Sequence, residues 1–193
     1  MEALKLLNEQ AIAESKVINE DAGNGVKRMY ITGPFLQAVD KNRNGRVYPR
    51  NIIEREVNKF QSLIESREAL GELSHPESIE INPDRSAILI TELKMDGNIA
   101  VGKAKVLSTP CGKILESLLS DGVRMGVSSR GTGNLCEDNT VAEDYNMATI
   151  DAVYMPSAQC AYSDPMYESV QYVCKWVLNE ATGLYVEKQE KII

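Results

Sequence analysis

Residues 87–107 read AILITELKMDGNIAVGKAKVL. Two runs rich in Ile, Leu, Val and Ala, at 87–95 and 99–107, flank the tripeptide Asp96-Gly97-Asn98. Apolar runs on either side of an Asp-Gly pair are typical of a β-hairpin, because glycine and asparagine tolerate the backbone angles of a tight turn. This segment therefore predicts an antiparallel sheet.

Further strands and two helices are expected on both sides of this hairpin. The expected strands are residues 29–39, 123–130 and 145–154, and the second of them leads into a turn at 131–133. Residues 50–67 place apolar side chains at helical spacing, and residues 110–119 begin with a proline that suits a first helical turn, so both are expected to be helices. The sum is an α+β fold, a mostly antiparallel β-barrel or curled sheet surrounded by helices.

The two ends of the chain are expected to lie outside this core. Leu4, Leu7 and Ile12 would share one face of a short helix, and the polar residues 21–25 would end it. Residues 1–25 are therefore expected to form an N-terminal helix and linker. The residues after 165 end in a charged sequence and are expected to form a C-terminal tail.

Composition restricts the class of protein. A chain of 193 residues with 43% hydrophobic residues suits one compact domain. A formal net charge of −7 does not favour a nucleic-acid-binding surface, and no run approaches the ~20 apolar residues of a membrane span. The first residues lack the features of a secretory signal. We therefore expect a protein of the cytoplasm in which it is made, with no nucleic-acid or membrane partner.

The residue types that bind metals argue against a cofactor. The four cysteines form no Cys-x-x-Cys pair and the chain has one histidine, so a zinc site would need ligands from distant loops. Residues 40–45, DKNRNG, resemble the start of a calcium loop, but Asn51 stands where such a loop needs a bidentate glutamate. We expect no cofactor, free thiols, and a simple turn at 40–45.

The one histidine, His75, stands in the sequence GELSHP, residues 71–76. Histidine is the side chain that exchanges protons most readily near neutral pH, which suits a general base. Pro76 favours an extended backbone at His75. A lone histidine can equally be a surface or structural residue, so its role depends on partners elsewhere in the chain.

A nucleophile for such a base is offered by GVSSRGTG, residues 126–133. In a strand, Ser129 would share a face with two apolar residues, whereas Ser128 would share a face with Gly126 and Arg130. We therefore expect Ser128 to be the nucleophile and Ser129 to support the loop, with Arg130 helping to organise donors around an oxyanion. The same sequence could be a phosphate-binding loop or a plain strand and turn, although it lacks the Walker A spacing.

An orienting partner for the histidine is offered by ATIDAV, residues 148–153. A carboxylate within an apolar strand is unfavourable to bury without a partner, and the N–H of an imidazole is a suitable one. Asp151 could equally face water from an edge strand, and the sequence leaves both interpretations open.

Several sequence blocks, taken together, resemble the prohead proteases of tailed bacteriophages, of the T-even type. The blocks are YITGPFLQA (30–38), NRNGRVYP (42–49), ALGELSHP (69–76), GVSSRG (126–131), DAV (151–153) and PSA (156–158). They run in the family order over the central part of the chain. This family is similar in fold to the herpesvirus assemblins, which implies an antiparallel barrel wrapped by helices.

The resemblance implies a serine endopeptidase of the Ser-His-Asp type. Ser128 would attack a peptide carbonyl, His75 would take its proton and Asp151 would hold His75. Ser129, Arg130 and nearby backbone N–H groups would support the site and the oxyanion. Assemblins have a second histidine in the third position, and an acid must replace it here because the chain has one histidine.

The resemblance also implies a place in head assembly. Such a protease acts inside the procapsid in the host cytoplasm, where it cleaves scaffold or core proteins, capsid-protein propeptides and itself. Residues 26–165 would be the protease domain. Residues 1–25 would be a propeptide, an interface or a linker, and the same alternatives stay open for the tail 166–193, which self-cleavage could remove. A homo-oligomer is left open. T-even-type members prefer glutamate before the scissile bond and an aliphatic residue two positions earlier, which predicts self-cleavage after Glu20 or Glu180.

Two other functions fit the same residues. One is a non-enzymatic capsid-assembly or scaffold protein that only binds partners, and the other is a hydrolase that acts on an ester. Substitution of Ser128 and His75 separates the first from a protease, and small ester substrates test the second.

Overall fold

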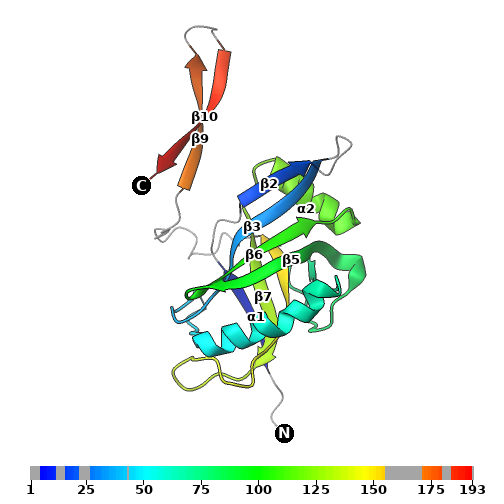
Figure 1. Ribbon diagram of the computed structural model, residues 1–193, viewed down its shortest axis with the longest axis vertical. Coiled ribbons are helices and arrows are strands. Elements are labelled where there is room, and N and C mark those ends of the chain that lie inside the picture. Colours follow the sequence, from blue (N-terminus) through cyan, green and yellow to red (C-terminus); the bar gives the residue numbers. More distant parts are fainter. Residues whose placement is uncertain are drawn as a thin grey trace.

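The computed structural model describes residues 5–11, 16–21, 27–42, 44–154, 171–179 and 184–192 (Figure 1). In chain order its elements are β1 (Lys5–Ala11), β2 (Lys16–Asp21), β3 (Lys27–Gln37), α1 (Arg50–Glu65), β4 (Leu70–Glu72), the 3-10 helix η1 (Pro83–Arg85), β5 (Ser86–Asp96), β6 (Ile99–Val106), α2 (Pro110–Ser120), β7 (Met125–Gly133), β8 (Asn146–Tyr154), β9 (Gln171–Asn179) and β10 (Leu184–Ile192).

The hairpin expected at residues 87–107 is confirmed and forms the centre of a five-stranded sheet. β5 and β6 pair antiparallel up to Asp96 opposite Ile99, and the full strand order is β2-β3-β6-β5-β4. All of its neighbouring strands are antiparallel. Alternate residues of β5 and β6, such as Ile88, Ile90 and Ala104, are buried in the core, as the period of two in a strand requires.

A second antiparallel sheet has the strand order β1-β7-β8. β7 and β8 confirm two expected strands, but the turn expected at residues 131–133 is wrong, because these residues are the end of β7. The two glycines there make room for Tyr145, since a Cβ on Gly131 would lie 2.8 Å from the Tyr145 ring and one on Gly133 would lie 3.0 Å from its Cα. Glycine serves close packing here and not a reversal of the chain.

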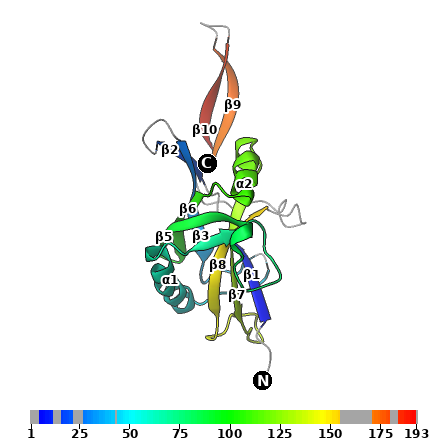
Figure 2. The ribbon, with the colours of Figure 1, turned by 90° about the vertical axis from the view of Figure 1, so that its right-hand side faces the viewer.

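The two sheets meet where β4 lies beside β8. Leu73, just after β4, forms a parallel bridge with Ala152, and the N–H of Ser74 donates to the Ala152 carbonyl at 2.7 Å. Figure 2 shows β7 and β8 beside the larger sheet, on the side away from α1. This junction brings the segment after β4 onto the surface of the smaller sheet.

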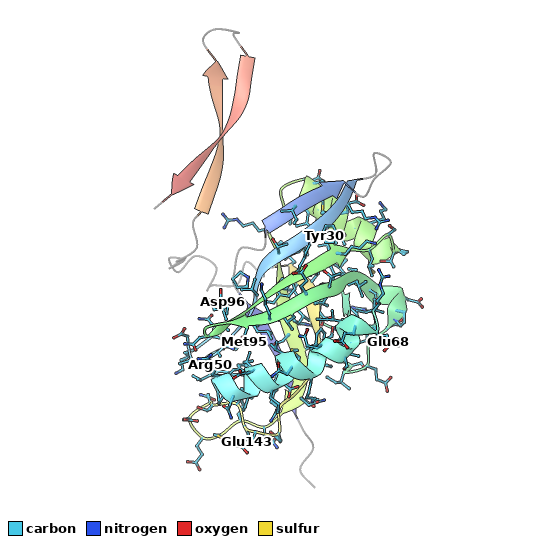
Figure 3. The ribbon with its side chains drawn as sticks, in the orientation of Figure 1. Tyr30, Arg50, Glu68, Met95, Asp96 and Glu143 are labelled. Atoms are coloured by element: carbon cyan, nitrogen blue, oxygen red, sulfur yellow. The ribbon has the colours of Figure 1, made fainter. Side chains whose placement is uncertain are left out.

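Both expected helices are confirmed. α1 packs along β5 through Ile52, Ile53, Val57 and Phe60, all buried, and the Gln61 amide donates to the Leu93 carbonyl at 2.9 Å. In Figure 3, Arg50 marks the first residue of this helix, and Glu68 lies just beyond its C-terminal end. α2 begins at Pro110, and the Thr109 hydroxyl caps it by accepting the Gly112 N–H at 3.1 Å.

The helix expected within residues 1–25 is wrong. The described parts of this segment are β1, which pairs with β7, and β2, which pairs with β3. Each strand is only 7 or 6 residues long and adds to a sheet edge, β1 beside the distant β7 and β2 beside the neighbouring β3, so strand pairing outweighs the weak local helical pattern. The C-terminal tail also contains strands, since β9 and β10 form an antiparallel pair.

The fold is therefore a mixed α/β architecture, rich in strands, with antiparallel sheets and the two helices α1 and α2. The closed barrel and the division of the chain at residues 25 and 165 stay predictions. No helix in the part of the chain that the structure describes is long and apolar enough to cross a membrane.

Candidate active site

The ladder between β7 and β8 places two expected site residues opposite each other. Ser128 pairs with Asp151 in the register, so their side chains project from the same face of the sheet. Both residues are fully buried. A buried carboxylate needs strong partners, and they come from β7 itself and from the segment that follows β4.

His75 reaches this face from the end of β4. The backbone of Ser74 is in the left-handed region, with φ 66°, and its N–H is held by Ala152 of β8. A non-glycine residue in this region is unfavourable by about 1–3 kcal/mol and persists only where its surroundings fix it. The turn at Ser74 thus takes the chain out of the β4 direction directly before His75.

The His75 ring bridges the two residues of the ladder. Its Nε2 lies 2.6 Å from the Ser128 Oγ, and its Nδ1 lies 2.8 Å from the Asp151 Oδ2. An ionised carboxylate only accepts hydrogen bonds, so Nδ1 carries the proton and Nε2 of the neutral ring is free to accept one from the Ser128 hydroxyl. The His75 side chain is 15% exposed, which leaves this site accessible from solvent on one side.

Asp151 accepts four N–H groups. Oδ1 accepts the backbone N–H of Glu72 at 2.9 Å and Nη2 of Arg130 at 3.2 Å. Oδ2 accepts Nε of Arg130 at 2.8 Å, in addition to the His75 ring. Such a set of donors fixes the position and plane of the carboxylate.

Arg130 lies behind Asp151 and is fully buried. Its Nε and Nη2 donate to Asp151, and Nη2 also forms an ion pair with Glu72 Oε1 at 3.3 Å. Nη1 donates to the carbonyls of Ser78 and Glu80 at 2.5 and 3.3 Å. The guanidinium is thus engaged with Asp151, Glu72 and these two carbonyls, an arrangement that favours a supporting role over the oxyanion role expected for Arg130 from the sequence.

Glu72 is a member of this cluster that the sequence did not identify. Its buried side chain accepts the backbone N–H of Asn82 at 2.6 Å through Oε1 and Nε of Arg85 at 3.1 Å through Oε2. The position of Glu72 three residues before the histidine, between Gly71 and Leu73, is a signal that could have been followed, because an acid among small and apolar residues needs a buried partner.

Ser129 lies on the opposite face of β7 from Ser128, as alternation in a strand requires. It is 3% exposed and pairs with Ile150 of β8, among the core residues Val127 and Ile150. Of the two neighbouring hydroxyls, only that of Ser128 is recorded in contact with His75 among the described residues.

The sequence also raised a calcium loop at residues 40–45 and a zinc site as alternatives. At residues 40–45 the Asn42 carboxamide oxygen accepts the backbone N–H groups of Asn44 and Arg46 at 3.0 and 2.9 Å, which is a side-chain-stabilised turn. Within the described residues no three His, Cys, Asp or Glu side chains are grouped so that they could hold a metal ion. Cys111 and Cys136 are free thiols.

Comparisons with known proteins identify relatives of this chain. A family model described as prohead core protein serine protease matches residues 2–171. The prohead core protein protease of Enterobacteria phage T4 is 37% identical over 145 residues, which cover 71% of this chain and 68% of that protein. Among solved structures, the bacteriophage T4 capsid assembly protease, gp21, has a TM-score of 0.74 and 32% identity, covering 80% of this chain and 100% of that one.

Proposed function

Since the chain belongs to the family of prohead core protein serine proteases, we propose that it cleaves peptide bonds by a Ser-His-Asp mechanism. In this proposal Ser128 is the nucleophile, His75 the general base and Asp151 the residue that orients His75. The observation that carries it is the continuous chain of contacts from the Ser128 Oγ through both ring nitrogens of His75 to the Asp151 carboxylate, at 2.6 and 2.8 Å.

The first half of the reaction forms an acyl-enzyme. The Ser128 Oγ attacks the carbonyl carbon of the scissile peptide bond, while Nε2 of His75 takes the hydroxyl proton. The resulting imidazolium is stabilised by Asp151, and it then gives the proton to the departing amine as the C–N bond breaks. The first product leaves with a free amino terminus, and the acyl group stays on Ser128 as an ester.

The second half regenerates the enzyme. Neutral His75 takes a proton from a water molecule, whose oxygen attacks the ester carbonyl, and the proton returns to the Ser128 Oγ as the ester bond breaks. The negative oxygen of both tetrahedral intermediates would be stabilised by backbone N–H groups near Ser128. Arg130 is not assigned this task, because its guanidinium donates to Asp151 and to the carbonyls of Ser78 and Glu80.

The biological setting follows from the family. Its natural substrates would be core or scaffold proteins and capsid-protein propeptides inside the procapsid, in the host cytoplasm. Self-cleavage would occur after Glu20, within the N-terminal segment 1–25, or after Glu180, within the tail 166–193, and assembly into a homo-oligomer stays open. We also propose that the two sheets curl into an assemblin-like barrel, supported by the bridge between Leu73 and Ala152.

Matched serine substitutions test the proposal. We expect Ser128→Ala to reduce cleavage of co-expressed scaffold and capsid precursors by about a thousandfold or more, because no other hydroxyl replaces the nucleophile. Ser129→Ala removes the neighbouring hydroxyl from the same strand and should retain cleavage within about tenfold, since it lies on the other face. Processing that persists in Ser128→Ala and in His75→Ala would favour a non-enzymatic assembly protein, and turnover limited to small esters would favour a different hydrolase.

A further inference from the structure

A cluster of buried charges lies behind the three residues assigned to catalysis. It consists of Arg130 and Glu72, which are both fully buried, and it ends at Arg85, whose side chain is 46% exposed. We propose that Arg130 and Glu72 are positioning residues for peptide hydrolysis, which hold the Asp151 carboxylate oriented toward His75. This inference rests on the proposed function and adds two residues to it.

Arg130 is placed to fix the plane of the Asp151 carboxylate. Its Nε and Nη2 contact the two carboxylate oxygens separately, at 2.8 and 3.2 Å, which is the two-pronged geometry that an arginine offers and a lysine does not. Asp151 Oδ2 must share its lone pairs between Arg130 and His75. The direction of the guanidinium therefore sets where the remaining lone pair of Oδ2 meets the imidazole N–H.

Glu72 holds Arg130 in turn and contacts Asp151 through its backbone. Its Oε1 lies 3.3 Å from Arg130 Nη2, and its own N–H donates to Asp151 Oδ1 at 2.9 Å. A β-bulge between Gly71 and Glu72 occurs where β4 pairs with β5. A bulge re-aims the residues that follow it, which is consistent with a side chain placed for a specific partner.

The same pair also holds the chain that follows His75. Arg130 Nη1 donates to the carbonyls of Ser78 and Glu80, and Glu72 accepts the N–H of Asn82. Residues 76–85 have little regular structure apart from η1, so these bonds replace a backbone ladder. Together with Glu72 and Arg85, this segment lines a cavity of about 390 Å³, which gives the outer end of the cluster access to solvent.

The charges of the cluster balance one another. Asp151 and Glu72 contribute two negative charges and Arg130 and the half-exposed Arg85 two positive ones, so the cluster is balanced before the imidazole takes a proton. The other acids of the segment that follows His75, Glu77, Glu80 and Asp84, are exposed. Removal of the Glu72 charge would make the cluster net positive and would disfavour the imidazolium.

The experiment uses the full chain with Glu72→Gln, Arg130→Lys and their double variant. Glu56→Gln is the matched control, because Glu56 is as buried as Glu72 but belongs to a different group of side chains. It accepts hydrogen bonds from Arg55, Lys59 and the backbone N–H of Met147. The substrate is a quenched fluorescent peptide with the sequence of residues 14–25, ESKVINEDAGNG. A fluorophosphonate probe measures the reactivity of Ser128 independently. Circular dichroism gives the folded fraction of each variant.

We expect two separate signatures. Arg130→Lys keeps the charge but loses the two-pronged contact, so kcat should fall about tenfold or more with KM within about twofold and the pH profile in place. Glu72→Gln should lower kcat and move the acidic limb of the kcat/KM profile to lower pH by about half a unit. Because Glu72 acts through Arg130, the fold-decrease in kcat of the double variant should be smaller than the product of the fold-decreases of the two single variants.

The outcomes separate this inference from the proposed function. Folded Glu72→Gln and Arg130→Lys variants with the kcat and pH profile of Glu56→Gln would overturn the positioning role while wild-type cleavage stands. The same holds if their losses are fully explained by a smaller folded fraction. Wild-type protein that neither cleaves the peptide nor labels at Ser128 would overturn the proposed function, and the positioning role with it.

Discussion

Gly71 of β4 lies directly against the backbone of Ile150 on β8. A Cβ added to Gly71 would come within 2.1 Å of the Ile150 carbonyl oxygen and 2.7 Å of the Ile88 Cγ1. This contact allows the edge of the larger sheet to approach the smaller one. Ile150 directly precedes Asp151 in β8, and Gly71 lies four residues before His75 in the chain. The site depends on this approach, because its three residues come from both sides of the junction.

The variant Gly71→Ala should weaken both the fold and the site. The added methyl group would force β4 away from β8, at a cost of about 1–3 kcal/mol in the free energy of unfolding. Thermal melting checks the stability, and peptide cleavage at a temperature where the variant is folded checks the site. Ser62→Ala, at an exposed position of α1, is the control and should stay within about 0.5 kcal/mol of the wild type. A wild-type melting temperature for Gly71→Ala would contradict the tight junction.

Asp151→Asn should remove most of the activity while it preserves the shape of the side chain. An amide can donate to the ring, so it no longer fixes the proton on Nδ1 of His75, and kcat should fall by about a thousandfold or more. The buried Arg130 would also lose one of its two anionic partners, which should lower stability by about 3 kcal/mol. Steady-state kinetics and chemical denaturation measure the two effects. Asp144→Asn, at an exposed carboxylate that bonds Asn134, should change neither by much.

The rate should depend on pH in a direction that follows from the role of His75. Only the neutral imidazole accepts the Ser128 proton, so kcat/KM should rise from about pH 5 toward a plateau near neutrality. Rates of peptide cleavage across this range measure the effect, with circular dichroism at each pH to show that the protein stays folded. A folded enzyme with a constant rate from about pH 5 to 8 would argue against His75 as the base.

Self-cleavage after Glu20 or Glu180 stays a prediction. Glu20 lies in β2 opposite Arg28 of β3, so a cut there requires β2 to leave the sheet, whereas Glu180 falls outside the described residues. Mass spectrometry of active protein should show fragments that end at one of these glutamates. Ser128→Ala protein should keep both ends, and intact termini in the active protein would count against the prediction.

The sequence was informative where local patterns and tertiary structure agree. The hairpin at residues 87–107 and the helix α1 carry strong periodic signals, and the structure retains both. Strand alternation also separated Ser128 from Ser129 correctly by face, since the two lie on opposite sides of β7. By contrast, β1 is held by β7, which is distant in the chain, and no local pattern could reveal that pairing. β2 pairs with β3, which follows it closely in the chain, so this pairing was missed locally, where the sequence was read as a helix and linker.

The surroundings of the site were harder to predict than its central residues. The sequence suggests that His75, Ser128 and Asp151 have suitable chemistry, but it does not give the direction in which a long side chain extends. Arg130 was expected to face an oxyanion, whereas it turns toward Asp151 and the carbonyls of residues 78 and 80. Glu72 matters only once β4 is known to lie beside β8, which is information about the tertiary fold.

The spacing of the site along the chain has a consequence for protein synthesis. His75 precedes Ser128 by 53 residues and Asp151 by 76, and the contact of Gly71 with Ile150 also needs β8. A nascent chain that has left the ribosome only as far as β7 carries a hydroxyl and an imidazole with no carboxylate to align them. On the proposed mechanism, the order of translation thus keeps the chain without proteolytic activity until β8 has been synthesised.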